Sequence, residues 1–395
     1  MKIVLTGASG FVGREVVPLL AKAGADLCLV GRTPETLRQL FPHHQSIGYD
    51  EVSKIGTGAD MLVHLAVRNN NVPGTPEDFT RDNADLAIST LSLARTAGIS
   101  RFVAVSSVQV MTGKQDDSYV QSKRLMEKRL ADESGIDISV LHLPLVYGSG
   151  FAGRLSFLSR LPPFLQKPLF NCVAALKPTV AAQKLADHIL EGAASGIVSD
   201  GQARNPVFRL IKRLIDLFFV AVVIGFFWWL LILLWLAVRL TSSGPGIFTQ
   251  IRLGRSKIPF TLLKFRSMAQ GTKQAGTHEV SAASVTRIGG FMRATKLDEL
   301  PQVWNILTGQ LSLIGPRPGL PNQSELMLCR ERHGVFAARP GITGLAQIEG
   351  IDMSVPERLA QKDAEYLALQ GLILELKIAL ATFTGKGGGD NVDTR

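Results

Sequence analysis

The sequence has few cysteines, its first residues do not predict a signal peptide, and it shows no internal repeat. Its 395 residues include three cysteines, Cys28, Cys172 and Cys329, an odd number without the spacing of metal ligands. A disulfide framework is therefore not expected, and a reducing cytoplasm suits these thiols. The apolar stretch after Met1 is broken at Gly7, too early for a signal peptide, so we expect folding to begin in the cytoplasm.

The positive charge of the chain is not arranged for nucleic acid. Lys and Arg number 43 against 33 Asp and Glu, which gives a formal net charge of +10. These basic residues gather around one long apolar run and form no stripe with interleaved aromatic residues. We therefore expect an anionic membrane surface and phosphate-bearing substrates as partners, and no nucleic acid.

The chain divides into two regions that have different patterns. Residues 1–195 alternate short β-branched runs with amphipathic helical stretches, which predicts an α/β fold with a Rossmann-like, doubly wound parallel sheet. Residues 196–207 are rich in small and polar residues and are expected to be a linker. Residues 208–384 are expected to form a small α-rich domain with an apolar helix at 214–240, and residues 385–395 a disordered tail.

A glycine-rich segment follows the first predicted strand and opens a helix. It reads Thr6-Gly7-Ala8-Ser9-Gly10-Phe11-Val12-Gly13. Gly7 and Gly10 permit a tight turn around a pyrophosphate at the helix N-terminus, and Gly13 permits close helix packing. The second strand ends at Arg32, where an NAD site would carry an acidic residue. The expected cofactor is therefore NADP(H), with NAD as the alternative.

Ser107, Tyr119 and Lys123 form a second pattern in this region. Ser107 lies just past a predicted strand, and Tyr119 and Lys123 are four residues apart, on one face of a helix. The ammonium group would lower the pKa of the phenol, so that Tyr119 exchanges a proton with a carbinol or carbonyl while Ser107 holds the same oxygen. The alternative is an ordinary surface pair.

These motifs together resemble the extended short-chain dehydrogenase/reductase family, whose members include nucleotide-sugar epimerases and reductases. Further matching segments are Asp60 to Ala66, Asn83 and Pro144 to Gly148. The residues to which the resemblance assigns roles are the glycine segment, Leu65 and Ala66 for the cofactor, and Ser107, Tyr119 and Lys123 for catalysis.

The reaction of this region is expected to be reduction of a 4-keto UDP-sugar. Leu143 stands where the family usually has an arginine, the segment before Tyr119 is short, and the substrate region is small. These departures keep two alternatives open: a 4-epimerase, and a non-catalytic module that binds a nucleotide sugar.

A carboxylate pair, Asp298-Glu299, follows the apolar run. Pro301 fits only the first turn of a helix, so the pair is expected at a helix N-terminus. Asp298, with Thr295 three residues before it, could simply cap that helix. Alternatively, one carboxylate attacks a phosphorus centre while its neighbour helps to hold a divalent metal. The cations that could offset the charge of a nucleotide sugar's diphosphate are Lys264, Arg266, Arg293 and Arg317.

These residues resemble the bacterial sugar transferase family, the monotopic phosphoglycosyl transferases. The matching segments are Lys212 to Asp216, Ser243 to Pro245, Phe248 to Gly254, Lys264 to Met268, Arg293 to Gln302, Gly315 to Pro318, Pro340 to Gly344 and Asp363 to Tyr366. The resemblance implies that Asp298 attacks a UDP-sugar, forms a phosphosugar-enzyme intermediate and releases UMP. It also implies that Asp298 and Glu299 bind Mg²⁺, and that Arg293, Pro316 and Arg317 contact the phosphates.

The same resemblance implies an acceptor and a place in the cell. A polyprenyl (undecaprenyl) phosphate would take the phosphosugar at the bacterial inner membrane, as in polysaccharide biosynthesis. A non-enzymatic membrane anchor is the rival interpretation, and a homodimer is a further expectation.

The apolar run from Leu214 to Leu240 exceeds the about 20 residues that a bilayer helix needs. A buried helix of a soluble protein is the alternative. Family members carry a Ser-Pro break in a re-entrant helix, whereas Trp228 and Trp229 stand there in this chain, so nothing local forces a kink. Basic residues flank both ends and favour the cytoplasmic side for each. We therefore expect a re-entrant hairpin in the inner-membrane lipid with its bend near Gly225, against a straight spanning helix.

Overall fold

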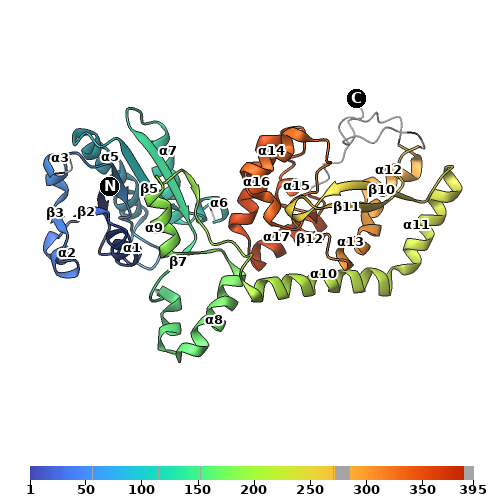
Figure 1. The fold of residues 1–395 in the computed structure, drawn as a ribbon, viewed down its shortest axis with the longest axis horizontal. Coiled ribbons are helices and arrows are strands. Elements are labelled where there is room, and N and C mark those ends of the chain that lie inside the picture. Colours follow the sequence, from blue (N-terminus) through green and yellow to red (C-terminus); the bar gives the residue numbers. More distant parts are fainter. Residues whose placement is uncertain (56, 114, 152, 270, 272–284, 387–395) are drawn as a thin grey trace. The chain divides into compact units, whose positions relative to one another are not determined.

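The computed structural model describes residues 1–386 except 56, 114, 152, 270 and 272–284. The chain forms two compact units (Figure 1). The first comprises Met1–Phe170 and Pro178–Asp200, and the second comprises Asn171–Lys177 and the chain from Gly201 onward. The tail expected at 385–395 lies outside the described residues from 387 on.

The first unit is built on a sheet of seven parallel strands. In chain order they are β1 (Lys2–Thr6), β2 (Asp26–Val30), β3 (Gln45–Ile47), β4 (Met61–His64), β5 (Arg101–Ser107), β6 (Asp137–Leu143) and β9 (Gly196–Ile197). Their spatial order is β3-β2-β1-β4-β5-β6-β9, which is that of a doubly wound dinucleotide-binding sheet with one added edge strand. The predicted Rossmann-like sheet is therefore confirmed.

Helices cover both faces of this sheet (Figure 1). The helices and remaining strands of the first unit are α1 (Phe11–Lys22), α2 (Pro34–Leu40), η1 (Tyr49–Glu51), α3 (Val52–Ile55), α4 (Pro76–Phe79), the π-helical η2 (Thr80–Asp85), α5 (Leu86–Thr96), α6 (Gln109–Thr112), α7 (Ser118–Ala131), β7 (Leu145–Tyr147), η3 (Gly153–Arg160), β8 (Thr179–Ala181) and α9 (Ala182–Leu190). Helix α8 (Pro163–Leu176) contributes residues to both units.

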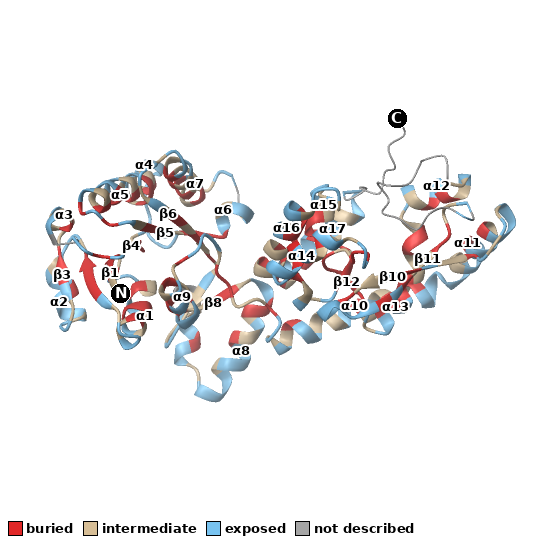
Figure 2. Ribbon diagram, turned by 45° about the horizontal axis from the view of Figure 1, so that its top comes forward, coloured by how far each residue is buried: buried red, intermediate tan, exposed pale blue. Residues whose placement is uncertain are grey.

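The strand sequences explain this arrangement. Ile3 and Leu5 of β1 pack with α1 and α9, whereas Val4 packs on the opposite face with α5 and α7. Successive side chains of a strand alternate between faces, and here both faces are covered, so the strands are apolar throughout. Figure 2 shows the buried strands between these helices.

The boundary between the units differs from the linker expected at 196–207. Gly196 and Ile197 form β9 and pair with β6, so the chain stays in the first unit up to Asp200. Asn171–Lys177, expected in the first domain, belongs to the second unit. There the Asn205 side chain donates to the carbonyl of Asn171 (3.0 Å). The linker was inferred from the local sequence pattern, which does not indicate contacts between segments far apart in the chain.

The second unit combines two apolar helices, two small sheets and a set of short helices. Its elements are α10 (Pro206–Phe226), α11 (Trp228–Thr241), β10 (Ile247–Leu253), η4 (Arg255–Lys257), β11 (Pro259–Phe265), α12 (Arg287–Ala294), η7 (Leu297–Gln302), α13 (Val303–Leu307), β12 (Ser312–Ile314), α14 (Ser324–Arg332), η8 (Val335–Ala337), β13 (Gly341–Thr343), α15 (Leu345–Ile348), α16 (Pro356–Leu369) and α17 (Leu372–Phe383). Strands β10 and β11 form an antiparallel hairpin, and β12 and β13 a parallel pair.

The apolar run forms two helices, α10 and α11, with a bend of 70° between them. No single helix among the described residues is long and apolar enough to cross a membrane, whereas this pair is, by length and composition, when taken together. The one helix expected at 214–240 is thus broken. The break falls at Phe227 (φ −114°, ψ 15°), two residues after Gly225, near which the bend was expected.

Tertiary packing explains how the chain bends without proline. Val220 and Val223 of α10 are buried against Phe260 and Leu262 of β11. Leu234 and Val238 of α11 are buried in a different cluster, with Phe265 and Met292. Each helix is therefore held by a different part of β11. At Gly225 an added Cβ would meet nothing within 4 Å, so the bend does not require glycine there.

Candidate functional site

The glycine segment of the first unit forms a tight loop between β1 and α1. Gly7 has φ +74°, and a Cβ at this position would lie 2.5 Å from the backbone nitrogen of Ala66. A Cβ at Gly13 would lie 2.5 Å from the Gly7 carbonyl oxygen and the Ala8 Cα. Only glycine allows these approaches, so the loop is pressed against the chain that leaves β4 and presents the α1 N-terminus.

The other expected cofactor residues surround this loop. Helix α1 begins at Phe11 and Val12 with Gly10 as N-cap, and the Ser9 carbonyl accepts a hydrogen bond from Arg14 Nε (2.8 Å). Leu65 and Ala66 follow β4, where the Leu65 amide donates to the Thr6 carbonyl (3.2 Å) and the Ala66 amide to the Thr6 hydroxyl (3.4 Å). Arg32 is exposed just after β2.

The expected catalytic residues meet at the ends of β5 and α7, but their electrostatics differ from expectation. Burial raises the pKa of Tyr119, opposed by its hydrogen bond with Ser107 and supported by the charge of Asp117. Lys123 is 2% exposed, and its Nζ donates to the Val105 carbonyl (2.8 Å). Burial lowers the pKa of Lys123 to about 8, against the raising effect of Glu127. The expected lowering of the Tyr119 pKa is therefore wrong for this structure.

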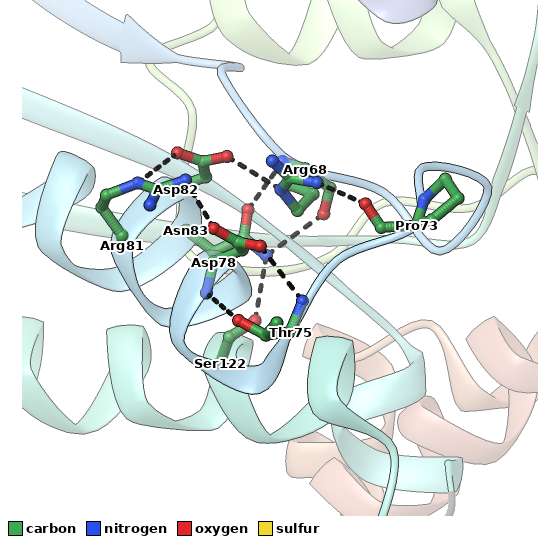
Figure 3. Close-up of polar contacts among 8 residues, drawn as sticks. All are labelled: Arg68, Pro73, Thr75, Asp78, Arg81, Asp82, Asn83 and Ser122. Carbon is green, nitrogen blue, oxygen red and sulfur yellow. Dashed lines mark hydrogen bonds and ion pairs between the residues drawn. The ribbon is translucent and has the colours of Figure 1, made fainter.

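A hydrogen-bond network joins the segment after β4 to the catalytic helix (Figure 3). The buried Asn83 side chain accepts from the Arg68 amide (2.8 Å) and donates to the Arg68 carbonyl (3.2 Å) and to the Ser122 hydroxyl (2.9 Å). Arg68 in turn donates to Asp82 (2.8 Å) and to the Pro73 carbonyl (2.7 Å). The matching motif indicated Asn83 but not Arg68 or Ser122, because nothing local in the sequence links residues 15 or 39 positions away from Asn83.

His64 has a structural position in this unit. It is fully buried, stacks on Phe102 and lies 3.0 Å through Nδ1 from the Thr6 hydroxyl. Burial lowers its pKa to about 3, with a further lowering from Lys123. The ring is therefore neutral at pH 7 and packs inside this unit.

In the second unit, the carboxylate pair begins a helical segment, as expected. Asp298 and Glu299 are 7% and 8% exposed and lie in the first turn of the 3₁₀ helix η7, which continues into α13. The N-cap residue is Lys296, with φ +57°, and not Asp298. The Thr295 hydroxyl bonds back to the carbonyls of Phe291 and Met292. The capping interpretation of Asp298 and Thr295 is therefore not what the structure shows.

Two cations converge on one oxygen of Glu299. Lys264 of β11 lies 2.7 Å from Glu299 Oε1, and Arg317, which follows β12, lies 3.2 Å from the same atom. These side chains are 15% and 23% exposed, and that of Glu299 is 10% exposed. Arg293 lies in the last turn of α12, which packs against η7. Of the four cations expected around the pair, Lys264 and Arg317 thus bond to Glu299. Arg293 lies on α12, which packs against the segment that carries the pair.

A close approach of backbones positions Arg317. The Gly315 amide donates to the Thr343 carbonyl (2.8 Å), and the Gly341 amide donates to the carbonyl of the buried Pro316 (2.9 Å). A Cβ at Gly341 would lie 2.1 Å from the Gly315 nitrogen. Glycine at these positions therefore lets the segment after β12 run beside β13 and hold Arg317 against the pair.

The basic residues that precede the apolar run are anchored inside the second unit. Lys212 donates to the Ile314 carbonyl (2.9 Å) and pairs with Glu375 (2.5 Å). Arg213 donates to the carbonyls of Ile306 and Leu307 (2.7 and 2.8 Å). The buried Asp216 accepts from the Leu313 amide (2.8 Å). These three motif residues therefore join α10 to the core of the second unit. Lys212 and Arg213, two of the basic residues that precede the apolar run, make contacts inside the protein.

Arg266 differs from the other cations. It is 6% exposed, and its Nη2 donates to the carbonyl and hydroxyl oxygens of Ser242 (3.0 and 2.7 Å). In the described part of the chain, Nε and Nη1 of Arg266 have no hydrogen-bond partner. A buried donor left unsatisfied costs about 1–3 kcal/mol, and more when charged, so a further partner is expected there.

Mg²⁺ fits the chemistry of the carboxylate pair. Among the residues with described positions, no group of three or more His, Cys, Asp or Glu could hold a metal. Mg²⁺ does not need such a cage, because it commonly binds through one or two carboxylates together with waters and substrate phosphates. Asp298 and Glu299 provide that number of carboxylates.

Comparisons with known proteins match the two units separately. The model of the bacterial sugar transferase family matches residues 207–386, and that of the NAD dependent epimerase/dehydratase family matches residues 3–163. The UDP-glucose:undecaprenyl-phosphate glucose-1-phosphate transferase of Caulobacter vibrioides is 36% identical over 217 residues, which cover 51% of this chain and 80% of that protein. The UDP-N-acetylgalactosamine-undecaprenyl-phosphate N-acetylgalactosaminephosphotransferase of Aeromonas hydrophila is 33% identical over 46% of this chain, which spans 42% of its length.

Solved structures match the first unit at lower identity. The Bordetella bronchiseptica enzyme WbmH in complex with NAD⁺ is 19% identical, with a TM-score of 0.40 over 51% of this chain and 75% of that chain. The UDP-N-acetylglucosamine 4-epimerase from Bacillus cereus is 18% identical, with a TM-score of 0.38 over 50% of this chain and 76% of that chain.

Proposed function

The chain belongs to the bacterial sugar transferase family through residues 207–386, and on that premise we propose that its second unit transfers a sugar 1-phosphate from a UDP-sugar to polyprenyl (undecaprenyl) phosphate. The observation that carries this proposal is the buried Asp298-Glu299 pair, with Lys264 and Arg317 both on Glu299. The named relatives transfer glucose 1-phosphate or N-acetylgalactosamine phosphate to undecaprenyl phosphate, which supports this class of substrate.

Asp298 is the nucleophile of the first step. Its carboxylate oxygen forms a bond to the phosphorus that bears the sugar, while the bond from that phosphorus to the bridging oxygen of UMP breaks and UMP leaves. The family resemblance assigns this role to Asp298, and its neighbour Glu299 lies against Lys264 and Arg317 through Oε1. In the second step an oxygen of polyprenyl phosphate attacks the same phosphorus, and the Asp298 carboxylate leaves. The product is a polyprenyl diphosphate sugar.

The cations around the pair bind the diphosphate. Lys264, Arg293 and Arg317 offset the negative charge that moves to the UMP oxygen as the bond breaks, and the backbone at Pro316 holds Arg317 in place. Mg²⁺, when bound by Asp298 and Glu299, supplies further charge stabilisation on the phosphate oxygens.

The test of the nucleophile is the variant Asp298→Asn. It keeps the side-chain volume but removes the nucleophilic oxygen, so UMP release should fall to below about 0.1% of the wild-type rate, the scale on which loss of a nucleophile acts. UMP is measured with a UDP-sugar and undecaprenyl phosphate. Asp352→Asn, at an exposed position, is the matched control and should keep the wild-type rate. Unchanged release in Asp298→Asn would refute the assignment.

For the first unit, we propose that it binds NADP(H) and reduces a 4-keto UDP-sugar that the second unit then uses. The close backbone approaches at Gly7 and Gly13 support binding of a dinucleotide. The exposed Arg32 after β2 suits the 2′-phosphate of NADP better than the ribose 2′-hydroxyl of NAD. Oxidation of NADPH, compared with NADH, by purified protein with candidate 4-keto sugars tests both points. Redox-neutral interconversion of sugars at C4 would instead establish a 4-epimerase.

One observation favours a second candidate, a non-catalytic module that binds a nucleotide sugar. In this structure Lys123 donates to Val105, and burial raises the pKa of Tyr119, so the environment does not favour the phenolate that would accept a proton from a sugar hydroxyl. Cofactor binding without turnover would support this alternative.

The bent pair α10–α11 is proposed to enter the bacterial inner membrane from the cytoplasmic side and return to it. Its large exposed apolar side chains include Phe218 at 70%, Phe226 at 74% and Trp228 at 55% exposure, and Figure 2 shows exposed stretches along both helices. Lipid contact would bury this surface. A re-entrant path also keeps NADPH and the UDP-sugar on the same side of the membrane.

A further inference from the structure

Arg266 has hydrogen-bond donors that no described residue uses. Its side chain is buried, and one nitrogen, Nη2, is occupied by Ser242. Its Nε and Nη1 are without a hydrogen-bond partner among the described residues. Buried polar groups are normally paired, and exceptions point to a water, an ion or a ligand. A guanidinium forms its strongest hydrogen bonds with phosphate and carboxylate oxygens, so an anion suits this position.

The backbone places Arg266 beside the carboxylate pair. The Arg266 amide donates to the Gly246 carbonyl (3.1 Å), so the pairing of β10 and β11 continues one residue past the end of β11. Lys264, two residues earlier, bonds to Glu299. Residues i and i+2 of an extended chain point to the same face, about 7 Å apart. An anion bound by Arg266 is therefore a neighbour of the Asp298-Glu299 pair.

The contact with Ser242 sets Arg266 apart from the other cations. Ser242 is the residue that ends the apolar helix α11. Arg239, exposed in the last turn of that helix, donates to the Gly244 carbonyl (2.7 Å) and adds positive charge at the same end. Lys264 and Arg317 are more exposed than Arg266, which suits a nucleotide that arrives from water. A lipid phosphate, by contrast, has its chain among apolar helices and its headgroup at their end.

We propose that Arg266 binds the phosphate of the polyprenyl phosphate acceptor and not the diphosphate of the UDP-sugar, an inference that rests on the proposed transferase function. Ser242 orients the guanidinium through Nη2, and the remaining N–H groups hold the acceptor phosphate. An oxygen of that phosphate forms the new bond to the sugar-bearing phosphorus while the bond from this phosphorus to Asp298 breaks. Arg266 thus acts in the second step of the reaction and not in the first.

The two half-reactions test this assignment separately. Without acceptor, the full-length protein in detergent should exchange labelled UMP with a UDP-sugar, which requires the first step alone. With undecaprenyl phosphate at varied concentrations, the full reaction gives the KM for the acceptor. Arg266→Lys keeps the charge but loses the planar set of donors, so it should raise this KM about tenfold or more. UMP exchange should stay within about twofold of wild type, because the first step makes no use of the acceptor.

Two variants serve as controls. Arg358→Lys, at an exposed position on α16, should change neither quantity. Lys264→Met should show the opposite selectivity, with slower UMP exchange. If Arg266→Lys fails to fold, as judged by its thermal unfolding midpoint, Ser242→Ala decides the matter, since it removes one of the two bonds that orient Arg266 and should raise the same KM.

The outcomes are distinct. An unchanged acceptor KM, or an equal loss of exchange and of transfer in Arg266→Lys, would overturn the assignment of Arg266. Absence of UMP exchange in the wild-type protein would instead contradict the proposed two-step transfer and leave Arg266 without its substrate.

Discussion

Glu299, which follows Asp298 in the sequence, has two cations on one carboxylate oxygen. Glu299 Oε1 accepts hydrogen bonds from Lys264 at 2.7 Å and from Arg317 at 3.2 Å. On the proposed function, this arrangement suits Glu299 to organise cations around the diphosphate. The family resemblance assigns the nucleophilic role to Asp298.

The variant Glu299→Gln tests whether Glu299 contributes to the reaction or only supports the structure of the site. The amide keeps the shape but leaves Lys264 and Arg317 without their shared anion. UMP release should fall by about 10²–10³, the effect of removing one electrostatic element of a transition state, and the Mg²⁺ concentration for half-maximal rate should rise. A Mg²⁺ titration of UMP release measures both. Glu331→Gln, which breaks an exposed pair with Lys257, should leave both unchanged, and a full rate in Glu299→Gln would contradict the role.

His64 gives the first unit a predictable response to acid. Burial lowers its pKa from 6.5 to about 3. Between these values the unfolded chain binds a proton that the folded chain does not, so the free energy of unfolding decreases as the pH falls through this window. In His64→Asn the dependence should weaken by up to about 1.4 kcal/mol per pH unit. Urea unfolding followed by hydrogen exchange in β4 at pH 4 to 7 measures this, and identical slopes would argue against a neutral buried ring.

At the scale of elements, the apolar run shows how tertiary packing replaces a missing sequence signal. A Ser-Pro pair would have predicted a break in the helix, but this chain has Trp228 and Trp229 at that position. The bend arises because α10 and α11 pack into separate clusters on β11. The aromatic side chains at the bend remain exposed, Trp228 at 55% and Trp229 at 48%, which suits the membrane interface, where Trp is enriched.

A re-entrant path predicts that both ends of the pair lie in the cytoplasm. The background for the test is Cys172→Ser, because Cys172 is exposed while Cys28 and Cys329 are buried. In that background, Arg209→Cys places one thiol at an exposed position in the first turn of α10, and Ser243→Cys places one at an exposed position just after α11. A membrane-impermeant maleimide should label both in permeabilised cells and neither in intact cells. Labelling of either thiol in intact cells would establish a spanning path.

At the scale of the whole molecule, the expected catalytic residues fall in two separate units. The first holds Ser107 and Tyr119, which share a hydrogen bond, and the second holds Glu299 against Lys264 and Arg317. If the first unit completes the sugar that the second transfers, each should work without the chemistry of the other when it is given its own substrate.

Crossed variants test this independence. Tyr119→Phe should slow NADPH oxidation with a 4-keto UDP-sugar about 100-fold or more, because it removes the proton donor, and should leave UMP release from a finished UDP-sugar unchanged. Asp298→Asn should show the reverse pattern. Full NADPH turnover in Tyr119→Phe would count against both the reductase and the epimerase. Binding of NADPH with no turnover in the wild-type protein would favour the non-catalytic module.

Local chemistry was readable from the sequence alone. The glycine loop, a doubly wound parallel sheet and the helical start near Asp298 follow from turn geometry, residue alternation and Pro301, each set by neighbouring residues. The resemblance to the bacterial sugar transferases also lies in contiguous motifs, and family membership confirms it.

The tertiary structure alone decided which distant groups meet. Lys264 bonds to Glu299 across 35 residues, Lys212 bonds to Glu375 across 163, and Lys123 donates to the carbonyl of Val105 across 18. The bend at Phe227 also depends on contacts between distant segments, and so do the N–H groups of Arg266 that have no partner among the described residues. Their physical cause is packing and desolvation between segments far apart in the chain, which a pattern of neighbouring residues does not encode.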